Sequence, residues 1–88
     1  MPEIEHWSYM EILNVMGRSV QKIFMLQEKT EDFFRRLGEK LISLILTKDQ
    51  VTQVYEKIEI IKEMLLKKGY KEDGDAHVVL NKIKEFFA

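Results

Sequence analysis

Apolar residues recur every three or four positions through the first half of the chain. From Met16 to Leu44 the steps alternate between four and three residues without a change of phase, as in the buried seam of a coiled-coil-like helix. The seam consists of Met16, Val20, Ile23, Gln27, Thr30, Phe34, Leu37, Leu41 and Leu44. This pattern predicts one long helix over residues 8–46, roughly 57 Å in length.

Two local signals mark the start of this helix. Ser8 and Glu11 have the spacing of a capping box, in which each side chain satisfies a free backbone N–H of the first turn. Trp7 and Ile12 stand at the two positions of a hydrophobic staple across the same helix start. We therefore expect residues 1–7 to be an N-terminal tail.

The alternative is a break near Thr30, which could cap a second helix. Against it, Phe33 stands where a capping box needs Glu or Gln, and Lys29 stands where a staple needs an apolar residue. The seam also keeps its phase through this region, so we predict an unbroken helix. Gly17 and Gly38 follow seam residues and are expected to be sites of close approach or mild bends.

A second helix is predicted over residues 48–68. Thr47 and Gln50 form another capping box, and Gly69 follows basic residues at the other end, as is usual after a helix C-terminus. Because the connection is short, this helix should lie antiparallel against the C-terminal half of the long helix.

A short third helix is predicted over residues 75–87, with Asp75 as its N-cap. It could lie along the N-terminal half of the long helix or fold back on the second helix. The expected fold is all-α: a single domain over residues 1–88, built from a long helical hairpin and a short C-terminal helix.

Composition supports a folded helical domain and excludes several function classes. The chain is 45% hydrophobic and 33% charged, with a net charge of −1 that is spread evenly over its two halves. This balance gives no electrostatic attraction to nucleic acid or anionic lipid, and no apolar run approaches the ~20 residues that span a bilayer. The absence of cysteine and of a secretory signal pattern favours a cytoplasmic location.

The predicted helices carry more apolar surface than three segments can bury. Leaving several large side chains in water would forgo ~1.5–3 kcal/mol each, a large part of the expected stability of about 4 to 13 kcal/mol. We therefore expect the N-terminal half of the long helix to pack on a second copy, which gives a homodimer that can also bind a protein partner. The alternative is a monomeric three- or four-helix bundle, in which a break near Thr30 lets every apolar face be covered within one chain. The predicted interface residues are Val15, Phe24, Met25, Leu26, Phe33, Ile60 and Met64.

The sequence contains no convincing catalytic, cofactor or metal site. His6 and His77 are expected to be exposed, and Glu3 with His6 matches the Glu-x-x-His element of di-iron bundles only once, before the first helix. We therefore predict a non-enzymatic interaction module without cofactors, such as a small adaptor, regulator or chaperone. The alternative is a small DNA-binding transcriptional regulator, although no helix shows a one-sided stripe of basic residues.

Overall fold

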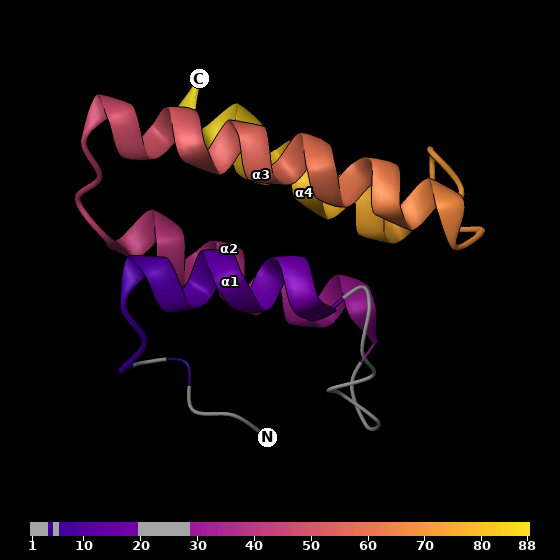
Figure 1. The fold of residues 1–88 in the computed structure, drawn as a ribbon, viewed down its shortest axis with the longest axis horizontal. Coiled ribbons are helices and arrows are strands. Elements are labelled where there is room, and N and C mark those ends of the chain that lie inside the picture. The colour runs from indigo at the N-terminus through magenta and orange to yellow at the C-terminus, as the bar shows by residue number, and fades with distance from the viewer. Residues whose placement is uncertain (1–3, 5, 20–28) are drawn as a thin grey trace.

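The computed structural model describes residue 4, residues 6–19 and residues 29–88 of the chain, and this part is helical with no strand. These ranges contain four helices, which are α1 (Tyr9–Ser19), α2 (Thr30–Ser43), α3 (Lys48–Lys67) and α4 (Asp75–Phe87). All four run close to the long axis of the molecule (Figure 1).

The helices form a bundle in which each helix touches two others. The contacting pairs are α1–α2, α2–α4, α4–α3 and α3–α1, so α1 faces α4, and α2 faces α3, diagonally across the core. As the colours of Figure 1 show, α1 and α3 run in one direction, and α2 and α4 run in the other. The neighbouring pairs α1–α3 and α2–α4 are therefore parallel.

The prediction of one unbroken helix over residues 8–46 is wrong. Lys29 has an extended backbone (φ −70°, ψ 150°), and α2 begins at Thr30, the site of the alternative break. No side chain caps this start, and the hydroxyl of Thr30 lies 3.0 Å from that of Tyr70 instead. The break lets α2 fold back beside α1, which buries apolar faces of both helices within one chain.

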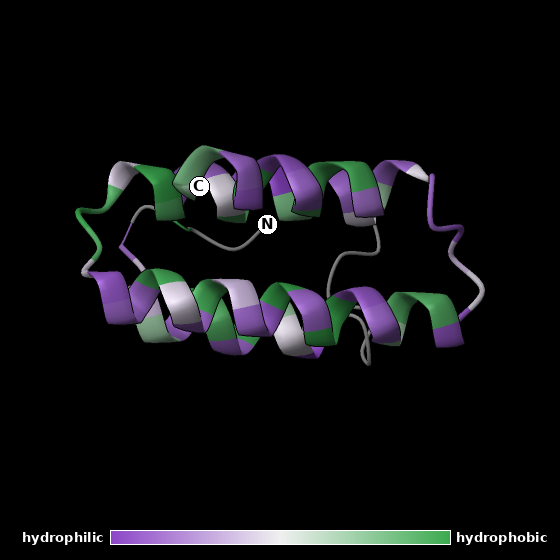
Figure 2. Cartoon of the chain, turned by 90° about the horizontal axis from the view of Figure 1, so that it is seen from above, coloured by the Kyte–Doolittle hydropathy of each residue, from purple (hydrophilic) through white to green (hydrophobic). Residues whose placement is uncertain are grey.

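The predicted packing of the second helix against the C-terminal half of the first is also wrong, because α2 and α3 lie diagonally opposite. The connection between them crosses one end of the bundle and appears as a green, hydrophobic segment in Figure 2. Leu44 and Leu46 pack against the core, whereas Ile45 is 101% exposed. This alternation is expected where the backbone is extended, as it is at Leu44.

The start of the first helix is confirmed. The Glu11 carboxylate accepts from the Ser8 N–H at 3.1 Å, and the Ser8 hydroxyl accepts from the Glu11 N–H at 3.3 Å. Two described residues that precede the helix also pack on the bundle, since Ile4 is buried and Trp7 is partly buried against the core. Ile4, which was expected to belong to the tail, is thus part of the core.

The predicted limits of α3 are confirmed to within one residue. The Thr47–Gln50 capping box is complete, with the Gln50 N–H bonded to the Thr47 hydroxyl and the Thr47 N–H bonded to the Gln50 side chain. At the other end Gly69 has a φ of +94°, which glycine adopts without the strain that a side chain would cause. These two boundary signals act locally, so packing does not shift them.

We expect Thr47→Ala to lower the free energy of unfolding by about 1 kcal/mol, because the Gln50 N–H at the start of α3 loses the Thr47 hydroxyl as its acceptor. Urea unfolding followed by circular dichroism measures the change. Thr52→Ala is the matched control, since the Thr52 hydroxyl bonds back to the Lys48 carbonyl inside the helix and caps nothing. Equal losses in the two variants would contradict the capping role of Thr47.

Helix α4 has the predicted range but a different cap. Gly74 is the N-cap and makes no side-chain cap bond. Asp75 is the first helical residue, where its negative charge interacts favourably with the helix dipole. Packing against both α2 and α3 secures this helix. Helix α4 approaches α2 closely at Gly38, where an added Cβ would lie only 2.5 Å from Ile83 Cδ1. The predicted role of Gly38 as a close-approach site is confirmed.

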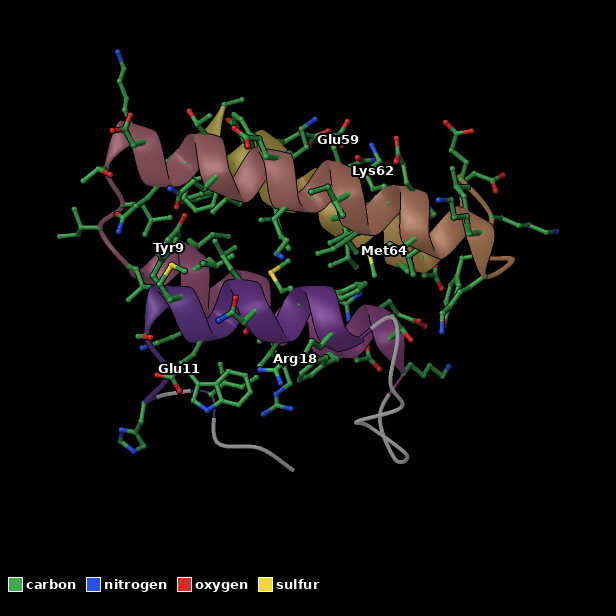
Figure 3. All side chains as sticks on the ribbon, in the orientation of Figure 1. Tyr9, Glu11, Arg18, Glu59, Lys62 and Met64 are labelled. Atoms are coloured by element: carbon green, nitrogen blue, oxygen red, sulfur yellow. The ribbon has the colours of Figure 1, made fainter. Side chains whose placement is uncertain are left out.

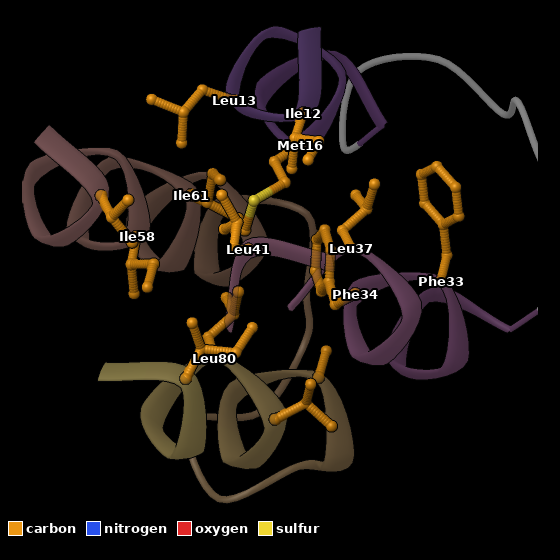
Figure 4. Close-up of a cluster of buried hydrophobic side chains, with 14 of the residues drawn as sticks. Ile12, Leu13, Met16, Phe33, Phe34, Leu37, Leu41, Ile58, Ile61 and Leu80 are labelled. Atoms are coloured by element: carbon orange, nitrogen blue, oxygen red, sulfur yellow. The ribbon is translucent and has the colours of Figure 1, made fainter. Parts of the chain in front are cut away.

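The core lies between all four helices (Figure 4). Of the described seam residues, Met16, Phe34, Leu37 and Leu41 are fully buried and Thr30 and Leu44 are partly buried, so the seam lies on the core side although it belongs to two helices. The core also includes Ile4, Ile12, Leu13, Phe33, Val54, Ile58, Ile61, Leu65, Ala76, Val79, Leu80 and Ile83.

Candidate functional site

The seven predicted interface residues divide into three groups. Phe24, Met25 and Leu26 lie outside the described residues. Phe33 is only 1% exposed, so within one chain it is a core residue rather than a surface residue. The remaining three, Val15, Ile60 and Met64, lie on α1 and α3.

These three residues differ in exposure. Val15 and Met64 are partly buried against the core, whereas Ile60 is 55% exposed. Ile60 and Met64 are four residues apart and therefore share one face of α3. Figure 3 shows Met64 on the side of α3 that faces α1. Two of the apolar residues that were predicted to be exposed, Ile60 and Met64, thus lie next to the contact between α1 and α3.

A shallow hollow of about 330 Å³ lies between these two parallel helices. We call it the α1–α3 surface, and it is lined by Asn14, Gly17, Arg18, Lys57, Ile60 and Met64. Gly17 leaves room for Lys57, since an added Cβ would lie 3.1 Å from Lys57 Nζ. Four of these residues are not predicted from the sequence as site residues, although Gly17 is predicted as a possible close-approach position.

The α1–α3 surface combines an apolar floor with positive charge. Ile60 and Met64 supply the apolar part, Arg18 and Lys57 supply two cations, and none of the six lining residues is acidic. A second copy of the same surface would therefore place cations against cations. The chemistry that fits is an apolar group flanked by carboxylates.

Tyr9 fixes α1 against the start of α3. Its hydroxyl lies 2.8 Å from the Gln50 carbonyl oxygen and 2.8 Å from Gln53 Oε1, and it donates to these acceptors. Burial raises the pKa of Tyr9 above the usual 10.0, because desolvation disfavours the phenolate. The alignment of the two helices that form the α1–α3 surface depends in part on this contact.

We expect the stabilising effect of the Tyr9 hydroxyl to decline above pH 10. Below that pH, Tyr9 is neutral in both folded and unfolded chains, so its contribution, about 1 kcal/mol for a net hydrogen bond, is complete. Above pH 10 the unfolded chain ionises first, and stability is lost until the folded form also ionises. Urea unfolding at pH 8 and pH 11 should show wild type losing its advantage over Tyr9→Phe. A constant difference would contradict this prediction.

His77 is buried, so the prediction that it is exposed is wrong. Its Nε2 lies 3.2 Å from the Lys62 carbonyl oxygen, and because a carbonyl only accepts, Nε2 carries the hydrogen. Nδ1 has no hydrogen-bond partner within the described residues. The imidazole therefore holds the first turn of α4 on α3. His6, by contrast, is exposed as predicted.

The described residues contain neither a candidate metal-binding cluster nor a candidate membrane-spanning helix. They contain no group of three or more His, Cys, Asp or Glu that could hold a metal ion. No helix in the described ranges has the length and apolar character to cross a membrane. Comparison of the chain with family models, with curated proteins and with solved structures gives no match.

Proposed function

We propose that this protein is a non-enzymatic interaction module, a small adaptor, regulator or chaperone, that acts as a homodimer and binds a protein partner. The α1–α3 surface is the proposed contact for that partner. The observation that carries the proposal is the exposure of Ile60 on a surface that also offers an apolar neighbour and two cations.

Ile60 is well placed to contribute binding free energy. Its side chain is more than half exposed, and transfer of an isoleucine from water into an apolar contact is worth about 1.5–3 kcal/mol at most. Helices α1 and α3 lie side by side and run in the same direction, and a surface between two packed helices is of the kind that accepts an amphipathic helix. The partner segment would place apolar residues on Ile60 and Met64, and carboxylates beside Arg18 and Lys57.

The partner interaction is tested by affinity capture from the native cell extract with three forms of the protein. We expect a partner that wild type and Leu66→Asp retain and that Ile60→Asp loses. Leu66 is the matched control, because it is an exposed apolar residue of α3 that does not line the α1–α3 surface. If all three forms capture the same proteins in the same amounts, the α1–α3 surface is not the contact.

The homodimer is tested separately by the mass in solution. One chain has a mass of 10.5 kDa, so a dimer has twice that value. Light scattering of purified wild type at micromolar concentration should give the doubled mass. A mass of one chain under these conditions would exclude the dimer and leave the partner interaction to be tested alone.

A further inference from the structure

We infer that the homodimer forms through the face shared by α2 and α4, with two copies related by a twofold axis that runs parallel to these helices. This inference rests on the proposed function, because it names the surface that makes the proposed dimer. It leaves the α1–α3 surface free for the partner protein.

This shared face, which we call the α2–α4 surface, has an apolar groove of about 300 Å³. Ile42 from α2 and Val78 and Val79 from α4 line it, and Gly38 lets the two helices approach closely. Phe86 is 58% exposed and follows Val78 and Lys82 at intervals of four residues, which places it on the same face of α4. The apolar area thus continues beyond the groove toward the end of the helix.

The charges beside this groove alternate in opposite order on the two helices. Along the chain direction, α2 presents Arg35 and then Glu39, whereas α4 presents Asp75 and then Lys82. Because α2 and α4 run in the same direction, the first charged residue along the groove is a cation on α2 and an anion on α4. Gly38 and Ile83 are in contact, Glu39 follows Gly38, and Lys82 precedes Ile83. The second charged residue of α2 and that of α4 therefore lie at about the same height along the two helices.

A face with this pattern is complementary to itself. The proposed twofold axis places α2 of one copy against α4 of the other, in the same direction. Glu39 then meets Lys82 of the second copy, and Arg35 comes within about one helical turn of Asp75 of the second copy. Each contact occurs twice. The α1–α3 surface lacks this property, because both of its charged lining residues are cations.

The state of the charges within one chain agrees with this arrangement. Arg35 pairs with Asp32 at 2.6 Å, whereas Glu39, Asp75 and Lys82 have no ion-pair partner among the described residues. Glu39 and Lys82 are exposed and can be changed without disturbing the core. These two residues therefore carry the test.

Area sets a further condition on the dimer. A stable interface buries about 800 Å² per partner, which is about a seventh of the 5863 Å² of accessible surface of this chain. The groove alone is too small, so the contact must include the exposed side chains of Val78 and Phe86. Helices of 14 and 13 residues, each about 20 Å long, provide a face of suitable length.

The test uses charge reversal and sedimentation of the full chain over a range of concentrations. In Glu39→Lys and in Lys82→Glu, like charges meet twice across the twofold axis, so the dimer dissociation constant should rise roughly tenfold or more. The double variant Glu39→Lys/Lys82→Glu should restore the dimer. Glu63→Lys is the matched control, because it makes the same charge change at an exposed position of α3, and it should associate like wild type.

An equal mixture of the two single variants makes the test specific for contact between chains. In the mixed dimer the lysine introduced by Glu39→Lys would meet the glutamate introduced by Lys82→Glu in the other chain. The unchanged Lys82 and Glu39 would meet at the second contact, so heterodimers should form where each variant alone is monomeric. An interaction within one chain cannot produce this rescue. If wild type is dimeric and the single variants remain dimeric, this inference is wrong while the proposed dimer stands. If wild type itself is monomeric, both fail.

Discussion

Leu41→Ala is expected to lower the free energy of unfolding by about 2–5 kcal/mol. Leu41 is fully buried and lies among core side chains from other helices (Figure 4), so the lost atoms would leave a cavity. The loss is large against the stability expected for 88 residues, about 4 to 13 kcal/mol. Urea unfolding followed by circular dichroism measures it. A loss at the upper limit would leave the variant largely unfolded without urea where the stability of wild type lies at the lower end of that range.

Leu66→Ala is the matched control for this substitution. Leu66 is 47% exposed on α3, and both leucine and alanine are good helix formers, so the change should stay within about 0.5 kcal/mol. If the two variants lose equal stability, Leu41 does not occupy a core position. The comparison also separates the loss of packing from any general effect of shortening a leucine.

The limits of α3 could be predicted from the sequence because their causes are local. The Thr47–Gln50 box involves residues three apart, and the turn at Gly69 depends on the φ angle of a single residue. Neither needs a distant segment in order to act. The same holds for the start of α1, where Ser8 and Glu11 cap the helix as expected.

The break before α2 could not be predicted in this way. Lys29 gives no capping bond, and the four-and-three spacing of apolar residues keeps its phase on both sides of it. The break is stabilised by contacts between residues far apart in the sequence, since α2 packs on α1 and α4 once the chain has turned back. A pattern along the chain reports which faces are apolar, but it does not report whether one helix or two present them.

The α1–α3 surface could be predicted only in part, because the sequence shows which residues of one helix are apolar but not which helices lie side by side. Ile60 and Met64 could be assigned as surplus apolar residues of one helix, from their spacing alone. The contribution of Arg18 and Lys57 depends on α1 lying beside α3, which no local signal encodes. The burial of His77 likewise depends on α4 packing on the main chain of α3 at Lys62.

The two helical glycines should respond in opposite directions to substitution by alanine. At Gly17 an added Cβ would meet only the flexible end of Lys57, at 3.1 Å, so Gly17→Ala should raise the free energy of unfolding by about 0.5–1 kcal/mol through better helix propensity. At Gly38 it would lie 2.5 and 2.6 Å from Cδ1 and Cγ1 of the buried Ile83. Overpacking of this kind costs about 1–3 kcal/mol, which outweighs the propensity gain.

Thermal and urea unfolding of the two alanine variants against wild type tests this contrast. Gly38→Ala should unfold at a lower urea concentration than wild type, and Gly38→Val at a lower one still, because a branched side chain needs α2 and α4 to separate further. The double variant Gly38→Ala/Ile83→Val should recover part of the loss, since the shorter side chain removes Cδ1, the atom nearest to the added methyl group. A stabilising effect of Gly38→Ala equal to that of Gly17→Ala would mean that α2 and α4 do not approach closely at this point, and the apolar groove between them would then have a different shape.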